Sequence, residues 1–335
     1  MHPGASGAAT PTLESTMSLS TRLTAIAALT LSALGSVQAA PLNTDGPAIY
    51  RPTGRGYGEV DEQATDEVRS RLGEAEFAKR LAQLAAASAT GISYHGGPVM
   101  TAAFTNVYYI YYGTWTATQK SILNGFMQTL GGTPIFNINT TYYNSAGAKV
   151  KNAIVLAGTY ADNYSMGKTL SDAGVKTIVS NAINGGHLPK DGNGVYFVLT
   201  APDVKESSGF GSKYCGWHTY AALGGTAIKY SFVGNASVIA PTGCGASGTT
   251  VNGDAGVDGM TSVIYHELSE TVSDPQLNAW YDSSGYENAD KCAWKFGTLY
   301  TAANGGKYNV SFGGRKWKLQ QNWVNAGSGG CKLAY

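Results

Sequence analysis

The chain carries few charged residues and no excess of either sign. Charged residues make up 13% of the 335 positions, and 23 lysines and arginines against 22 aspartates and glutamates give a formal net charge of +1. Proteins that hold nucleic acid or an anionic membrane surface need a basic field, which this composition does not supply. The sequence therefore argues against nucleic acid as a partner.

The sequence also lacks a run long enough to be a transmembrane helix. Its most apolar stretch, residues 23–37, has about 15 residues, whereas a spanning helix needs roughly 20. Arg22 precedes this stretch, and Val37-Gln38-Ala39 supplies small residues of the kind found at a signal-peptidase site. We predict a leader and signal peptide over residues 1–39. The mature protein is then secreted to the extracellular space, the periplasm or the cell wall, with no membrane anchor.

Cysteine is scarce and is confined to the C-terminal part of the chain, at Cys215, Cys244, Cys292 and Cys331. There is no Cys-x-x-Cys pair, which argues against a cysteine-based zinc site. An even number of cysteines in an exported chain instead predicts two disulfides, for which three pairings are possible. Cys215–Cys244 with Cys292–Cys331 is favoured, because each bridge closes one glycine-rich excursion.

Glycine and tyrosine, by contrast, are abundant, with 44 and 21 residues. Residues 40–91 are predicted to be an N-terminal extension with an amphipathic helix over 60–88, either a pro-segment or a packing helix. The composition changes after Gly91, so the main domain is expected over residues 92–335.

Strand and helix signals alternate in this domain. Apolar and aromatic runs predict strands over 104–112, 153–160, 195–200 and 227–233, and apolar spacing predicts helices over 116–130 and 170–183. This order predicts an α/β fold with a mixed, mostly parallel sheet, crossover helices and an edge strand at 227–233. Two glycine-rich loops, 205–225 and 241–259, are expected after these elements, and the fold is expected to include glycine-rich loops closed by the disulfides.

Residues 256–273 predict the helix that would carry the chemistry. An apolar stripe at helical spacing, predicted to pack on the sheet, comprises Val257, Met260, Ile264, Leu268 and Val272. His266 and Glu270 are four residues apart, so they project side by side from a different face. Glu267 follows His266 directly.

This spacing is that of a zinc-peptidase helix, in which two ligands at i and i+4 hold the metal and the intervening glutamate activates water. The pattern is His-Glu-x-x-Glu, which is less specific than His-Glu-x-x-His. His266 and Glu270 are thus predicted zinc ligands and Glu267 the catalytic base of a single zincin-like domain. Glu287 or Asp290 is expected as the third ligand, with His218 as a further candidate for that position. In the enzyme interpretation His218 is expected to orient or polarise the substrate. Asp274 is a further geometric possibility at the end of the helix.

The sequence leaves other interpretations open. The polar face of the helix can simply be solvated, with His and Glu adjacent by chance. In that case the protein would be a non-catalytic extracellular module, with aromatic residues such as Trp217, Trp280 and Tyr281 stacking on the sugars of a cell-wall polysaccharide. For the enzyme, the expected partners are extracellular proteins or peptides.

Several short motifs resemble one known family. They are Tyr94-His95-Gly96-Gly97-Pro98, the strand around Asn106–Gly113, Cys215-Gly216-Trp217-His218, Gly256-Val257-Asp258-Gly259-Met260, His266-Glu267-Leu268-Ser269-Glu270, Asn278-Ala279-Trp280-Tyr281 and Glu287-x-x-Asp290-x-Cys292. Together they resemble the EXORDIUM, or phosphate-induced protein 1, family of secreted plant proteins and their microbial relatives. The resemblance implies an extracellular or cell-wall protein, linked in plants to growth and to phosphate or brassinosteroid responses, but it implies no agreed reaction. Plant members carry Asn at the place of Asp274, which argues against Asp274 as a ligand.

Overall fold

The computed structural model describes residues 56–59, 75 and 91–335, all within one compact unit, Ala39–Tyr335. The predicted signal peptide and the predicted helix over 60–88 lie outside the described part, apart from residue 75. The α-helices are α3 (Ala117–Leu130), α4 (Pro134–Asn137), α5 (Asp172–Asn184) and α6 (Ala255–Ser273), and the 3-10 helices are η1 (Ile138–Thr141) and η2 (Asp290–Cys292). The strands of the main sheet are β1 (Gly56–Glu59), β3 (Thr105–Tyr112), β4 (Ile154–Asp162), β6 (Gly194–Thr200), β8 (Tyr214–Leu223) and β9 (Thr226–Gly234). The two-stranded pairs are β2 (Ser93–Tyr94) with β10 (Trp280–Tyr281), β5 (Thr169–Leu170) with β7 (Lys205–Glu206), β11 (Tyr300–Thr301) with β12 (Lys307–Tyr308), β13 (Val310–Phe312) with β14 (Arg315–Trp317), and β15 (Asn322–Trp323) with β16 (Cys331–Lys332).

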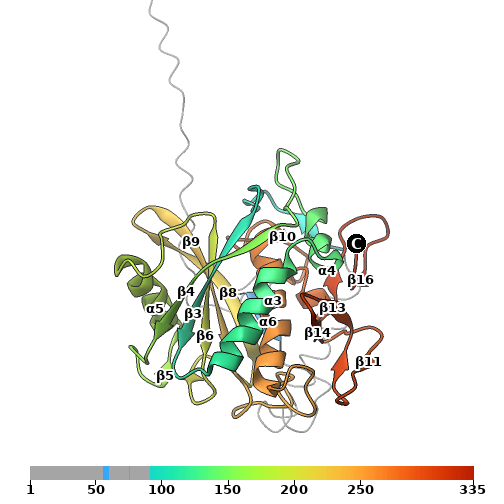
Figure 1. Cartoon of the computed structure of the whole chain (residues 1–335). Helices are drawn as coiled ribbons and strands as arrows, with labels where there is room; N and C mark the ends of the chain where they lie inside the picture. The colour runs from blue at the N-terminus through green and yellow to red at the C-terminus, as the bar shows by residue number, and fades with distance from the viewer. Residues whose placement is uncertain (1–55, 60–74, 76–90) are drawn as a thin grey trace, which may run out of the picture. The chain divides into compact units, whose positions relative to one another are not determined.

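The main sheet has the strand order β1-β8-β9-β6-β3-β4 (Figure 1). The strands β4, β3, β6 and β9 are parallel to one another, β8 is antiparallel to β9, and β1 is antiparallel to β8. All four predicted strands are in the parallel part of this sheet. The predicted α/β class with a mixed, mostly parallel sheet is therefore confirmed.

The crossover helices follow from local sequence. Thr116 begins α3 with a capping box, in which its side chain accepts from the backbone of Gln119 and the Gln119 side chain accepts from the backbone of Thr116. Ser171 caps α5 by accepting from the N–H of Gly174. From β3 the chain passes through α3 to β4, and from β4 through α5 to β6. In Figure 1, α5 lies on one side of the sheet and α3 and α6 on the other, so β6 in the middle is buried along its whole length.

One prediction about the sheet is wrong. Residues 227–233 were expected to form an edge strand and 205–225 a loop, but β9 lies inside the sheet, between β6 and β8. The strands β8 and β9 form a hairpin in which Gly224 and Gly225 both have positive φ. A two-residue turn that matches the right-handed twist of its strands requires this conformation. The glycines around β8 masked its strand pattern in the sequence. The edges are β4 and, beyond β8, the short strand β1 from the N-terminal extension.

The helix α6 runs close to its predicted bounds and is buried on every side. The apolar stripe is buried as expected, and so are His266, Glu267 and Glu270, so the interpretation of a solvated polar face is wrong. The reason is that α6 contacts β8, β9 and β1 of the sheet as well as α3 and β14. Its face toward β8 includes Val263 and Glu267, whose side chains lie over Gly216, so part of the polar face meets the sheet.

Both predicted disulfides are confirmed. Cys215 is bonded to Cys244 and Cys292 to Cys331, so no cysteine is free. The first bridge ties β8 to the loop before α6, and the second anchors η2 to the C-terminal strand β16. Within the described residues, none of the helices combines the length and the apolar character needed to span a bilayer.

Candidate metal centre

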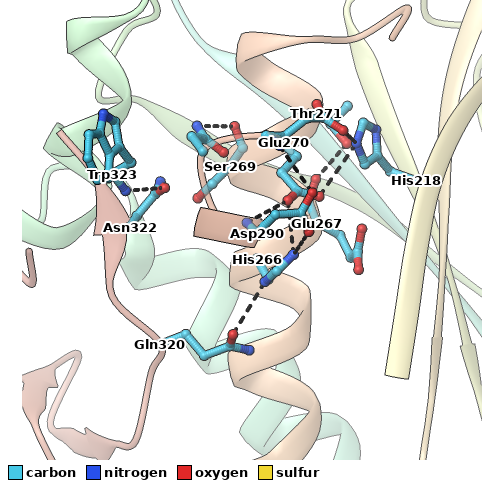
Figure 2. A network of polar contacts seen from close by, with 12 residues as sticks. His218, His266, Glu267, Ser269, Glu270, Thr271, Asp290, Gln320, Asn322 and Trp323 are labelled. Carbon is cyan, nitrogen blue, oxygen red and sulfur yellow. Dashed lines mark hydrogen bonds and ion pairs between the residues drawn. The ribbon is translucent and has the colours of Figure 1, made fainter. Parts of the chain in front are cut away.

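Three predicted residues meet at one point beside α6. His266 and Glu270 project from successive turns of the helix, and the imidazole Nε2 lies 2.9 Å from Glu270 Oε1. Asp290, at the start of η2, places Oδ1 3.3 Å from the same Nε2 (Figure 2). All three residues are buried. The fold thus brings Asp290, from the segment after α6, to the two side chains that lie one helical turn apart on α6.

These donors fit a zinc ion. One ligand atom from each of His266, Glu270 and Asp290 lies within 4.8 Å of the other two. Zinc held tetrahedrally by nitrogen and oxygen at about 2.0–2.2 Å separates its ligand atoms by roughly 3.3–3.6 Å. The separations of 2.9 and 3.3 Å from His266 Nε2 are close to this range, so small side-chain adjustments would admit the ion.

His218 and Glu287 lie on the other side of Glu270. His218 comes from β8, and its Nε2 lies 3.0 Å from Glu287 Oε2 and 3.6 Å from Glu270 Oε2. Ligand atoms of His218, Glu267 and Glu270 also lie within 4.8 Å of one another. Of the two residues expected as the third ligand, Asp290 is therefore beside His266, whereas Glu287 is beside His218.

The site gathers more carboxyl groups than its histidines can keep ionised. Burial raises the pKa of Glu270 to about 8, and Asp290 adds to this effect. Burial and the carboxylates of Glu270 and Asp274 hold the pKa of Glu287 well above its usual range. Burial lowers the pKa of His218 to about 3 with help from His266. For His266 burial opposes the charge, but Glu270 and Asp290 still hold its pKa well above the ordinary value. A bound cation would offset such carboxylates.

A polar network that the sequence did not reveal fixes the segment 287–292 on α6. Asn288 Nδ2 donates to the carbonyl of Ser269 and to Ser273 Oγ, each at 3.1 Å. The backbone N–H of Asp290 donates to Glu270 Oε1 at 3.1 Å. This hydrogen bond holds Asp290 against α6. The Cys292 disulfide holds the far end of the segment. Asparagine and serine at these positions carry no periodic or motif signal in a single sequence.

Gln320 is a second residue that the sequence did not single out. Its Oε1 lies 3.4 Å from His266 Nδ1 and accepts from the N–H of Trp294 at 2.8 Å. When Nδ1 donates to this oxygen, the Nε2 lone pair faces Glu270 and Asp290 (Figure 2). Ligating histidines are commonly oriented in this way by a group that accepts from the other ring nitrogen.

Gly216 of β8 sets the distance between the sheet and the helix. A Cβ at this position would lie 2.6 Å from Val263 Cγ1 and 3.1 Å from Glu267 Oε1. Only glycine lets α6 approach β8 this closely. The close approach brings Glu267 beside His218, two residues further along β8.

Other sequence candidates have structural roles. Asp274 Oδ1 accepts from the N–H groups of Asn278 and Ala279, so this carboxylate holds the turn after α6. Trp217, Trp280 and Tyr281 are all buried in the described fold. Their rings pack against neighbouring side chains and cannot stack on a sugar at the surface, so this part of the prediction is wrong.

Comparison with known proteins identifies the family. The phosphate-induced protein 1 conserved region matches residues 92–326. Protein EXORDIUM-like 5 of Arabidopsis thaliana is 30% identical over 272 residues, which cover 69% of this chain and 75% of that protein. Protein EXORDIUM-like 3 of the same plant is also 30% identical, over 69% of this chain and 80% of its own length. Protein PHOSPHATE-INDUCED 1 of Nicotiana tabacum is 28% identical over 57% of this chain and 67% of its own length.

No solved structure matches the chain. The matched region contains α6 and every residue of the candidate metal centre. The chain belongs to the EXORDIUM, or phosphate-induced protein 1, family.

Proposed function

We propose that the protein is a secreted zinc-dependent hydrolase of the metallopeptidase type, built on a zincin-like arrangement of helix and sheet. The observation that carries the proposal is the buried convergence of His266, Glu270 and Asp290, with Glu267 on the same helix. A buried cluster of carboxylates without a counter-charge is unfavourable, so its presence in a stable fold requires a compensating charge. A bound divalent cation would supply that charge.

The residues divide the work as follows. His266, Glu270 and Asp290 would hold zinc, and Gln320 would orient His266. When bound, the ion supplies Lewis acidity and makes a water molecule acidic enough to be deprotonated near neutral pH. Glu267 would accept the proton of the attacking water and pass it to the leaving group. His218, from the neighbouring strand, would orient or polarise the substrate carbonyl.

The ligand set predicts modest activity. Two carboxylates place more negative charge on zinc than two histidines do, so the ion would lower the pKa of a bound water less. We therefore expect slower hydrolysis than in a His-Glu-x-x-His enzyme, or a preference for higher pH.

The proposed location is extracellular, in the medium, the periplasm or the cell wall. Two disulfides support it, because such bridges persist in oxidising compartments. The proposed partners are then extracellular proteins or peptides, or cell-wall polysaccharides, and the mature form needs no membrane.

A second candidate function is a non-catalytic carbohydrate-binding or growth-related module of the cell wall. It is favoured by a cavity of about 230 Å³ beside the N-terminal half of α6. Trp294 and Phe296 line this cavity together with Lys318 and Asp258. Aromatic faces with a few polar groups suit a sugar ring. In this second function the sugar would bind in this cavity and not on the buried Trp217 and Trp280.

The experiment is to purify the chain without chelators and measure its bound metal and its hydrolysis of a peptide mixture. We expect bound zinc and slow cleavage that stops on chelation and returns with added zinc. A chain that takes up no zinc contradicts the proposal. Binding to cell-wall polysaccharide that is lost in Trp294→Ala but unaffected by chelation would favour the second function.

A further inference from the structure

Glu270 faces a histidine with each of its two carboxylate oxygens. Oε1 lies 2.9 Å from His266 Nε2, and Oε2 lies 3.6 Å from His218 Nε2. The two groups of potential ligand atoms in the described chain, His266 with Asp290 and His218 with Glu267, therefore share Glu270. A carboxylate that turns one oxygen toward each of two histidines is placed to bridge two ions.

The number of carboxyl groups in the cluster also favours more than one bound cation. Even with Glu267 left aside, Glu270, Glu287 and Asp290 bring three buried carboxyl groups together. Glu287 Oε1 has no hydrogen-bond partner in the described structure, and Glu287 Oε2 meets His218. When all three carboxyl groups are ionised, one divalent cation offsets two of their negative charges and leaves a buried excess on the His218 side of Glu270. Buried charges need compensation by an opposite charge or a metal.

We infer that the site holds two divalent cations, bridged by Glu270. The first is the ion of the proposed function, on His266, Glu270 and Asp290. The second would be held by His218, Glu267 and Glu270, with Glu287 beside His218 as a further carboxylate. Imidazole together with carboxylate suits first-row divalent ions such as zinc, manganese and iron. Two-metal hydrolase sites of this kind hold their ions about 3.5–4 Å apart.

The inference rests on the proposed function for the first ion only, and it changes the role of one residue. With a single ion bound, Glu267 acts as the base. With both ions bound, its carboxylate ligates the second ion. His218 likewise becomes a ligand instead of a substrate-orienting residue.

The test is the metal stoichiometry of the full chain. Purified protein is dialysed against excess zinc, freed of unbound ion and analysed for zinc per chain. A parallel sample is loaded with manganese and examined by electron paramagnetic resonance, which distinguishes coupled pairs from isolated ions. We expect two zinc ions per chain and the spectrum of a coupled manganese pair.

Variants assign the second ion. His218→Ala should reduce zinc from two ions per chain to one and remove the manganese coupling. His187→Ala is the matched control, because His187 is exposed and its ring stacks on Tyr160 away from α6, so this variant should retain two ions. Circular dichroism checks that both variants are folded.

The outcomes separate the two proposals. One ion per wild-type chain with an isolated manganese spectrum overturns the inference and leaves the proposed function standing. No bound ion overturns both. The wild-type measurement decides this even if His218→Ala does not fold.

Discussion

Glu267 and His266 are neighbours in the sequence, but replacing them should have different effects on metal binding. Glu267→Gln should abolish hydrolysis while the His266 ion stays bound, because the amide can neither accept the proton nor replace the carboxylate as a ligand of a second ion. His266→Ala should lose that ion and the activity together. Metal analysis and peptide hydrolysis on the same samples check both variants. Full activity in Glu267→Gln would contradict its role as base.

Gln320 offers a test of orientation without touching a ligand. Gln320→Ala removes the oxygen that faces His266 Nδ1, and loss of such an outer partner typically lowers metal affinity about 10–100-fold. Gln321→Ala is the matched control at the next position, and it should leave affinity unchanged. Zinc competition with a fluorescent chelator measures both. Equal affinities in the two variants would show that Gln320 does not orient the histidine.

At the scale of elements, the contact between β8 and α6 depends on Gly216. Gly216→Ala places a methyl group against Val263 and Glu267, and overpacking of this kind costs about 1–3 kcal/mol. We also expect weaker metal binding, because the helix must move away from His218. Gly174→Ala in α5 is the control, since its Cβ would lie at ordinary contact distances, 3.6 Å from Ser171 Oγ and 3.9 Å from Leu170 Cδ2. Urea unfolding of the two variants gives the comparison, and an equally stable Gly216→Ala would refute the role of this contact.

The second disulfide holds the segment that carries Asp290. Replacing Cys292 and Cys331 together by serine opens a loop of 39 residues, which should cost roughly 4 kcal/mol in the chain-entropy model. The variant should also bind the first ion more weakly, because η2 loses its anchor. The corresponding Cys215 and Cys244 variant should affect stability similarly but disturb the His218 side of the site instead. Unfolding and metal titration of the two double variants test this distinction.

For the molecule as a whole, the short strand β1 closes the edge of the sheet next to the site. It pairs antiparallel with β8, with Gly56 opposite His218, and it contacts α6 and η2. A chain that begins at residue 60 leaves the edge of β8 without a partner. We expect a chelator to remove metal from this chain several-fold faster than from a chain that begins at residue 40. Equal rates would show that β1 does not restrict access.

Some elements could be predicted from the sequence and others could not. The strands 104–112, 153–160 and 195–200 and the helix 257–273 could be read from the sequence, because each has an uninterrupted pattern of its own. The hairpin β8–β9 was missed, because glycine-rich flanks hid a strand whose partners are set by tertiary pairing. At the site, His266, Glu267 and Glu270 were predicted from helical spacing. The supporting residues Gln320 and Asn288 were not, since a single polar residue in a loop has no periodicity.

The sequence by itself determined the family, the parallel part of the sheet, the disulfide pairing and the helix that bears the candidate ligands. These features depend on local patterns or on residues whose chemistry is distinctive wherever they lie. Only the tertiary structure decided that Asp290 meets His266, that Glu287 meets His218, and that Glu270 lies between the two histidines. Those contacts depend on how closely α6 approaches β8 and on how segment 287–292 folds back onto the helix. Both are results of packing between distant parts of the chain, which spacing along the sequence does not encode.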